Sequence, residues 1–125
     1  MSEALVISVV DDDVWAREGI RDLVQSLGYR VSTFSSAEHF LESGRLADTV
    51  CVITDLQMPG MNGLELQRRL HAQGHRTPII FITAYPNDLR RGRAINSGTV
   101  GFLSKPFEDE ALIHCLNLAI GRSGG

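Results

Sequence analysis

The chain has little cysteine, no long apolar run and no cluster of basic residues. Its two cysteines, Cys51 and Cys115, are too few and too far apart for a zinc site or a disulfide framework, so both are expected to be small core hydrophobes. No apolar stretch approaches the roughly 18 residues of a membrane-spanning helix, and no basic region precedes a signal-like core at the N-terminus. These absences predict a cytoplasmic protein without membrane contact.

Neither sign of charge predominates, with 12 Lys and Arg against 15 Asp and Glu and a net charge of -3. Because nucleic-acid binding needs a basic surface, direct nucleic-acid contact by this chain is not expected. A length of 125 residues suits one domain with one continuous sheet. We expect the domain to cover residues 1–121, with 122–125 as a tail or the start of a linker.

Apolar runs alternate with helical patterns along the whole chain. Continuous apolar runs, typical of strands buried on both faces, cover residues 5–10, 50–54 and 78–82. Mixed or glycine-containing runs at 29–34 and 100–103 suit edge strands. The alternation predicts an α/β, doubly wound, flavodoxin-like fold with a five-stranded parallel sheet and helices on both faces. Placing the third strand inside the sheet selects the order 2-1-3-4-5.

The helices are predicted from their apolar stripes and end signals. The first is expected to end at Gly28 and to bury the stripe Ala16, Ile20, Leu23, Val24 and Leu27. Ser35 with Glu38 has the pattern of a capping box for the second helix, and Asn62 with Glu65 has the same pattern for the third, over 63–73. A fourth helix over 87–97 has little apolar face, and the last begins near Phe107.

Polar residues stand where the predicted strands end. Asp11 and Asp12 follow the first strand, Asp55 the third, Thr83 the fourth and Lys105 the fifth. Because the carboxyl ends of parallel strands share one edge, these side chains are expected to converge. Three carboxylates in one pocket repel each other unless a cation joins them, and an all-oxygen cluster suits Mg²⁺ or Mn²⁺. The lysine and threonine would complement a phosphoryl group on Asp55.

These residues stand in motifs that resemble the receiver domain of two-component response regulators, over essentially the whole chain. The motifs are Val10-Asp11-Asp12, residues 55–59 with Gly63, Thr83-Ala84 and Lys105-Pro106-Phe107. Asp13 and the run over 105–109 are most similar to the FixJ-type subfamily, whose receivers usually precede a LuxR-type helix-turn-helix domain. The expected function is therefore a phosphoacceptor in signal transduction that controls a transcription-regulating output, rather than an enzyme with turnover.

The resemblance implies a role for each matching residue. Asp55 would accept a phosphoryl group from a sensor histidine kinase. Asp12 would bind Mg²⁺ directly, Asp11 through water, and the Gln57 backbone carbonyl would complete the protein ligands. Thr83 would bind a phosphoryl oxygen, beside Lys105, whose peptide bond to Pro106 is expected to be cis.

Further roles follow from the same resemblance. Phe102 would turn inward as Thr83 moves, and Gln57 and Tyr85 would tune the slow self-dephosphorylation. The surface of the helix over 87–97, the strand over 100–103 and the last helix would change with phosphorylation and form a phosphorylation-dependent homodimer.

Four residues outside the metal and phosphoryl cluster are considered for function. Trp15 lies off the buried stripe beside the acidic cleft, so it is a candidate kinase-docking residue; the alternative is local packing over the helix start. His71 and His75 have the spacing of a metal pair, but Gly74 breaks the helix between them and argues against a ligand role. Asp13 is expected to be a helix N-terminal charge rather than a third metal ligand.

Two other classes share parts of this pattern. A phosphohydrolase of the haloacid dehalogenase type needs a second Asp two residues after its nucleophile, and here that residue is Gln57. A flavodoxin-like cofactor binder needs a Gly-, Ser- and Thr-rich phosphate loop after the first strand, where this chain has three aspartates. Within the receiver class, both a stand-alone regulator and a piece of a DNA-binding regulator stay open, and the linker-like ending favours the latter.

Overall fold

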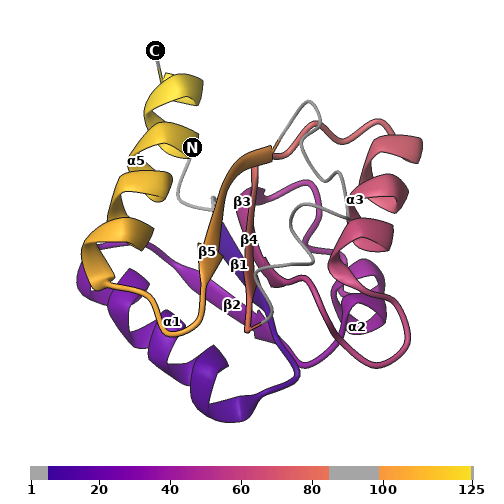
Figure 1. The fold of residues 1–125 in the computed structure, drawn as a ribbon. Coiled ribbons are helices and arrows are strands. Elements are labelled where there is room, and N and C mark those ends of the chain that lie inside the picture. The colour runs from indigo at the N-terminus through magenta and orange to yellow at the C-terminus, as the bar shows by residue number, and fades with distance from the viewer. Residues whose placement is uncertain (1–5, 85–98, 125) are drawn as a thin grey trace.

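The computed structural model describes residues 6–84 and 99–124 and contains a parallel sheet with helices on both faces (Figure 1). Its five strands are β1 (Val6–Val10), β2 (Val31–Phe34), β3 (Thr49–Asp55), β4 (Ile79–Thr83) and β5 (Thr99–Ser104). They pair in the order β2-β1-β3-β4-β5, and every pairing is parallel. The predicted fold class and strand order are confirmed, so the strands' carboxyl ends lie at one edge.

The helices enclose the sheet from two sides (Figure 1). Helices α1 (Val14–Ser26) and α5 (Asp109–Gly124) cover one face, and α2 (Ala37–Glu42) and α3 (Gly63–Ala72) cover the other. Because successive strand residues point to opposite faces, β1 and β3 contribute to both apolar clusters. Ile7 and Ile53 pack toward α1 and α5, and Val10 and Val52 pack toward α2 and α3.

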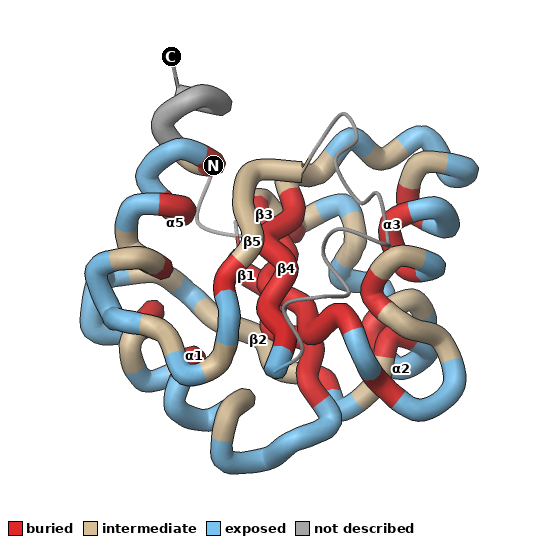
Figure 2. Tube along the Cα trace, in the orientation of Figure 1, coloured by how far each residue is buried: buried red, intermediate tan, exposed pale blue. Residues whose placement is uncertain are grey.

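Burial follows strand position as the sequence predicts. Strands β1, β3 and β4 are buried almost throughout, whereas β2 and β5 are mostly half-buried (Figure 2). Cys51 and Cys115 are both buried and unpaired, as expected of small core residues. Among the described residues, no helix is long and apolar enough to cross a membrane.

Helix α1 ends before Gly28 as predicted, but the last residue of its predicted buried stripe is exposed. Ile20 and Val24 are buried, and Gly28 follows with a φ of +97°, which favours glycine. Leu27, expected in the core, is 39% exposed. Its N–H bonds to the Val24 carbonyl three residues back, so the helix has already ended at this point and Leu27 turns away from the stripe.

Helix α2 begins one residue later than predicted. The side chain of Ser36, not Ser35, accepts the N–H of His39, so the predicted capping box of Ser35 with Glu38 is wrong. The Glu38 carboxylate instead accepts the backbone N–H of Met61, 23 residues further along the chain, at 3.0 Å. A tertiary contact has therefore replaced the local one.

Helix α3 has the N-terminus that its sequence predicts. Asn62 accepts the N–H of Glu65, and the Glu65 carboxylate accepts the N–H of Asn62, which completes the capping box. Leu66 and Leu70 are buried against the sheet. The direction of the chain after β3 is thus fixed by local side chains as well as by the core.

The C-terminal helix begins close to its predicted start but extends beyond its predicted end. It begins at Asp109, near Phe107, and continues to Gly124, so the expected tail is helical as far as that residue. Extending a formed helix adds one hydrogen bond per residue, which outweighs the poor helix propensity of glycine and serine here. The predicted helix over 87–97 and Tyr85 lie outside the described residues.

Candidate functional site

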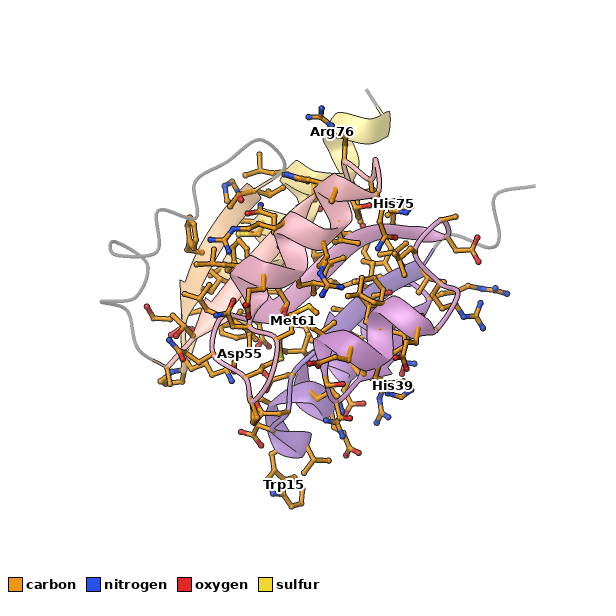
Figure 3. The ribbon with its side chains drawn as sticks, turned by 90° about the vertical axis from the view of Figure 1, so that its right-hand side faces the viewer. Trp15, His39, Asp55, Met61, His75 and Arg76 are labelled. Carbon is orange, nitrogen blue, oxygen red and sulfur yellow. The ribbon has the colours of Figure 1, made fainter. Side chains whose placement is uncertain are left out.

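The strand ends bring three carboxylates together. Asp11 directly follows β1, Asp55 is the last residue of β3, and Asp12 follows Asp11. One carboxylate oxygen from each of the three lies within 4.8 Å of the others, and Figure 3 marks the position of Asp55. Asp11 and Asp55 are buried, whereas Asp12 is exposed. The predicted convergence is therefore present, and it opens to solvent on the side of Asp12.

Lys105 joins the two buried carboxylates. Its Nζ lies 2.8 Å from Asp55 Oδ2 and 3.0 Å from Asp11 Oδ2. The other oxygen of each carboxylate accepts a backbone N–H at 2.9 Å, that of Gln57 for Asp55 and that of Asp13 for Asp11. Each carboxylate is thereby held in one orientation by a charge-assisted and a backbone hydrogen bond.

Burial and charge oppose each other at this centre. Burial, with a smaller contribution from the Asp55 charge, raises the pKa of Asp11, and this outweighs the lowering by the Asp13 N–H and Lys105. Burial lowers the pKa of Lys105, but the hydrogen bonds and charges of Asp55 and Asp11 outweigh it, and that pKa is raised. The ammonium therefore stays charged at neutral pH, while Asp11 holds a proton more readily than an exposed aspartate.

The fourth and fifth strands place the remaining predicted residues beside the cluster. Thr83 ends β4, is buried, and its carbonyl accepts the Lys105 N–H at 2.7 Å. The Lys105–Pro106 peptide bond is cis, as expected. Phe102 on β5 is half-buried and stacks on Phe81, with ring centroids 5.6 Å apart and planes at 16°. Thr83 and Lys105 are thus fixed to each other through the backbone.

Trp15 is 81% exposed and projects from the start of α1, so little of it is buried by local packing (Figure 3). It borders a surface pocket of about 330 Å³ that runs from α1 to Lys105, Pro106 and Phe107. Asp13 caps α1 by accepting the Trp15 N–H at 3.0 Å, which confirms its expected helix-terminal role. The tryptophan therefore stands on the surface next to the acidic cluster.

The histidine pair is remote from this centre. His75 lies near the end of α3, at the opposite side of the molecule from Asp55 (Figure 3). Gly74 follows the end of α3 with a φ of +86° and separates His71 from His75, as predicted. Within the part of the chain that the structure describes, three potential metal-binding side chains come together at Asp11, Asp12 and Asp55.

Two contacts of the site were not foreseen. Arg17 Nη1 donates to the Asp11 carbonyl at 2.7 Å, and Glu38 accepts from Met61 in the loop that follows Asp55. Arg17 has no sequence signal, since it is one of several charged residues on α1. Glu38 does have a sequence pattern, but that pattern predicted a capping box with Ser35 rather than a contact with Met61.

The oxygen donors suit a small divalent cation. Mg²⁺ and Mn²⁺ prefer carboxylate, carbonyl and water oxygens, and the three clustered carboxylates supply the first of these. A doubly wound sheet in this order, with carboxylates, a threonine and a lysine gathered at its strand ends, has the architecture of a receiver domain.

Comparison with known proteins gives the same assignment. The sequence profile of the response regulator receiver domain matches residues 7–117. The transcriptional regulatory protein FixJ of Azorhizobium caulinodans is 38% identical over 98% of this chain and 58% of its own length. The response regulator protein TmoT of Ectopseudomonas mendocina is 42% identical over 92% of this chain and 52% of its own length. The chain belongs to the receiver domain family of two-component response regulators.

A solved structure supports the fold independently. The response regulator StyR superposes with a TM-score of 0.84 and 42% identity over 95% of this chain and 62% of that chain. The chain spans about half the length of the curated relatives that it matches. Receiver domains are phosphoacceptors rather than true enzymes, so the family assignment removes the phosphohydrolase and flavodoxin-like alternatives.

Proposed function

We propose that Asp55 accepts a phosphoryl group from a phosphohistidine of a sensor histidine kinase. The observation that carries this proposal is the position of the Asp55 carboxylate, at a strand end, 2.8 Å from the Lys105 ammonium and within the acidic cluster. A carboxylate that accepts a phosphoryl group needs a nearby cation that can bind the negatively charged phosphoryl oxygens. Lys105 meets this need, and its Nζ lies closer to Asp55, at 2.8 Å, than to Asp11, at 3.0 Å.

A divalent cation, Mg²⁺ or Mn²⁺, completes the proposed site. Asp12 would bind it directly, Asp11 through water, and Asp55 and the Gln57 carbonyl would supply the remaining protein oxygens. When bound, the ion offsets the negative charges of the attacking carboxylate and of the phosphoryl oxygens. The donor set supports this role because all three carboxylates already lie within 4.8 Å of one another.

In the proposed transfer, the phosphoryl group moves from the kinase histidine to Asp55. A carboxylate oxygen of Asp55 attacks phosphorus, and the bond from phosphorus to the donor imidazole nitrogen breaks. The electron pair stays on that nitrogen, and the histidine leaves as neutral imidazole because its other ring nitrogen carries a proton. The Lys105 ammonium passes from the carboxylate to a phosphoryl oxygen, and the Thr83 hydroxyl donates to another. Hydrolysis of the acyl phosphate would be slow, and Gln57 and Tyr85 would tune its rate.

Phosphorylation is proposed to change the surface of the domain through movements of Thr83 and Phe102. Movement of Thr83 toward the phosphoryl group would make room for the Phe102 ring, which is half-buried against Phe81 in the present state. The surface that changes would include β5, α5 and the segment over 87–97. A phosphorylation-dependent homodimer through this surface is part of the proposal.

The whole protein is proposed to be a cytoplasmic transcription regulator. Residues 1–121 would form the receiver, and 122–125 would lead toward a LuxR-type DNA-binding domain. The support is the FixJ-type relatives, whose own length is nearly twice that of the matched region. The receiver itself would contact the kinase and its own second copy rather than nucleic acid.

Asp55 is tested with a small phosphodonor and with beryllofluoride, each in the presence of Mg²⁺. The protein should gain the mass of one phosphoryl group from the donor, and beryllofluoride should shift backbone NMR signals of β5 and α5. Asp55→Asn should abolish both effects, and Asp22→Asn, which removes an exposed carboxylate on α1, should keep them. Phosphorylation that persists in Asp55→Asn would refute the assignment.

Trp15 is proposed to contact the kinase during transfer. Its 81% exposure beside the pocket that reaches Lys105 supports this role. Trp15→Ala should lower the rate of phosphotransfer from the phosphorylated kinase by about tenfold, while phosphorylation by a small donor stays unchanged. Leu118→Ala, which truncates an exposed apolar residue on α5, is the control. An unchanged kinase rate in Trp15→Ala would end the docking hypothesis.

A further inference from the structure

We infer that Glu38 on α2 is a positioning residue for the metal and phosphoryl site, acting through the loop between β3 and α3. This inference rests on the proposed function, because the loop carries the Gln57 carbonyl assigned to the cation. Glu38 lies 17 residues before Asp55 in sequence, and its carboxylate contacts the far end of that loop rather than its own helix.

The loop over 56–62 is held at both ends. At its start the Gln57 N–H donates to Asp55 Oδ1 at 2.9 Å, and at its close the Gly63 N–H donates to the Leu56 carbonyl at 3.1 Å. Between these points the Met61 N–H donates to Glu38 Oε2 at 3.0 Å. The Asn62 N–H also donates to the Glu65 carboxylate, so Glu38 is the contact that ties this loop to α2 rather than to its own ends.

Gly60 shows how closely Glu38 approaches this loop. A Cβ at Gly60 would lie 2.8 Å from Glu38 Oε2, and the φ of +76° is one that side chains rarely adopt. The backbone thus turns toward the carboxylate at the one residue that permits both the turn and the approach. Met61 in turn packs against the apolar cluster under α2 and α3, which anchors the loop from its inner side.

Glu38 is therefore expected to affect the position of the loop near the metal site without affecting the stability of the fold. Glu38 is exposed and contributes little to the hydrophobic core, so its removal should leave the fold intact. Loss of the Met61 bond would broaden the positions available to the loop, including the Gln57 main chain. Outer groups that orient metal ligands typically change metal affinity by about tenfold or more when they are removed.

The test compares Glu38→Ala, Glu38→Gln and Glu42→Ala. Glu42 is the matched control because it is an exposed glutamate on the same helix. In the metal-free protein, amide hydrogen exchange at Met61 should be faster in Glu38→Ala and unchanged in Glu42→Ala. In a Mg²⁺ titration followed by Trp15 fluorescence, Glu38→Ala should bind about tenfold more weakly, with phosphorylation at saturating Mg²⁺ retained.

Glu38→Gln keeps an acceptor oxygen for the Met61 N–H and should restore both readouts. If Glu38→Gln behaves like Glu38→Ala, the effect comes from charge and the inference is overturned. It is also overturned if Glu38→Ala matches Glu42→Ala in exchange and affinity. Failure of the unmodified protein to bind Mg²⁺ or beryllofluoride would instead refute the proposed function, and the exchange at Met61 would still report the contact.

Discussion

Lys105 joins two carboxylates that would otherwise face each other across neighbouring strand ends. Its side chain is 20% exposed, and it contacts Asp11, which is fully buried, and Asp55, which is 7% exposed as a whole residue. Breaking such a pair from one side leaves a buried charge without compensation, which costs more than the pair itself contributes. The lysine is therefore a structural cation of the domain as well as the proposed phosphoryl ligand.

Lys105→Met should lower the free energy of unfolding by about 2 kcal/mol in the absence of divalent cations. Urea denaturation in the presence of a chelator measures this change. Arg21→Met is the control, because Arg21 pairs with Asp22 at an exposed site and its loss should cost about 0.5 kcal/mol or less. Equal stabilities for the two variants would contradict the structural role of Lys105.

Cys51 makes the fold sensitive to alkaline pH. Burial, with a smaller contribution from Cys115, raises the pKa of the Cys51 thiol from its ordinary value of 9.0 to about 12. The unfolded chain loses this proton at lower pH than the folded one, so stability is full below pH 9.0 and falls as pH rises from there toward 12.

Between about pH 9 and 10.5, this thiol should reduce the free energy of unfolding by about 1 kcal/mol per pH unit. Cys51→Ala is less stable at neutral pH because it leaves a cavity, but its stability should fall less steeply over this range. The difference in slope between the two proteins, measured by urea denaturation, isolates the thiol. Identical slopes would show that Cys51 is not protected from ionisation.

At the scale of elements, α3 rests directly on the end of β3. A Cβ at Gly63, the first residue of α3, would lie 2.6 Å from the Asp55 carbonyl and 3.2 Å from Leu56 Cα. Both neighbours are backbone, so they cannot move aside without shifting the strand end that carries the proposed phosphoacceptor. Glycine is required here for close approach.

Gly63→Ala should lower the free energy of unfolding by about 2 kcal/mol and shift the NMR signals of residues around Asp55. Gly19→Ala makes the same chemical change in α1, where a Cβ would meet nothing within 4 Å. That substitution should raise stability by about 0.8 kcal/mol, since alanine favours the helix. Chemical denaturation of both variants checks the opposite signs, and two stabilising substitutions would contradict the contact.

Element boundaries show how far local sequence reaches. The capping box of Asn62 and Glu65 was predictable because both partners belong to one turn of one helix. The start of α2 was not, because Ser35 and Ser36 offer the same hydroxyl and only the packing of Phe40 and Ala37 sets the phase of the helix. Leu27 was misplaced for a related reason, since the helix ends just before it.

At the scale of the molecule, the sheet brings charges together that the chain keeps apart. Asp11 and Lys105 are separated by 94 residues in sequence, and Asp55 and Lys105 by 50. The clustered carboxylates repel each other, and a bound cation would relieve that repulsion only in the folded state. Binding and folding are therefore coupled.

Mg²⁺ should stabilise the whole domain, by about 2.7 kcal/mol when its free concentration is 100 times its Kd. Asp12→Asn should remove most of this gain, since Asp12 is the exposed member of the cluster and its loss leaves the core unchanged. Thermal unfolding with and without Mg²⁺ measures the effect, with Asp22→Asn as a control that keeps it. A Tm independent of Mg²⁺ in the unmodified protein would contradict the metal site.

Much of the architecture follows from sequence pattern. Apolar runs at β1, β3 and β4, glycines such as Gly28 and Gly74, and carboxylates at strand ends predicted the fold, the strand order and the members of the cluster. Contacts between elements could not be predicted from the sequence pattern. Examples are the hydrogen bonds of Arg17 to the Asp11 carbonyl and of the Met61 N–H to Glu38. Such pairs leave no periodic signal, because their spacing in sequence reflects the path of the chain.

The sequence alone therefore determined which strands are internal and which carboxylates meet, because burial of apolar runs and the parallel arrangement leave few other solutions. Only the tertiary structure decided that one ammonium would bridge Asp11 and Asp55 and that Glu38 would support the loop beyond them. Hydrogen bonds of about 3 Å depend on the relative placement of whole elements, and that placement is fixed by packing in three dimensions.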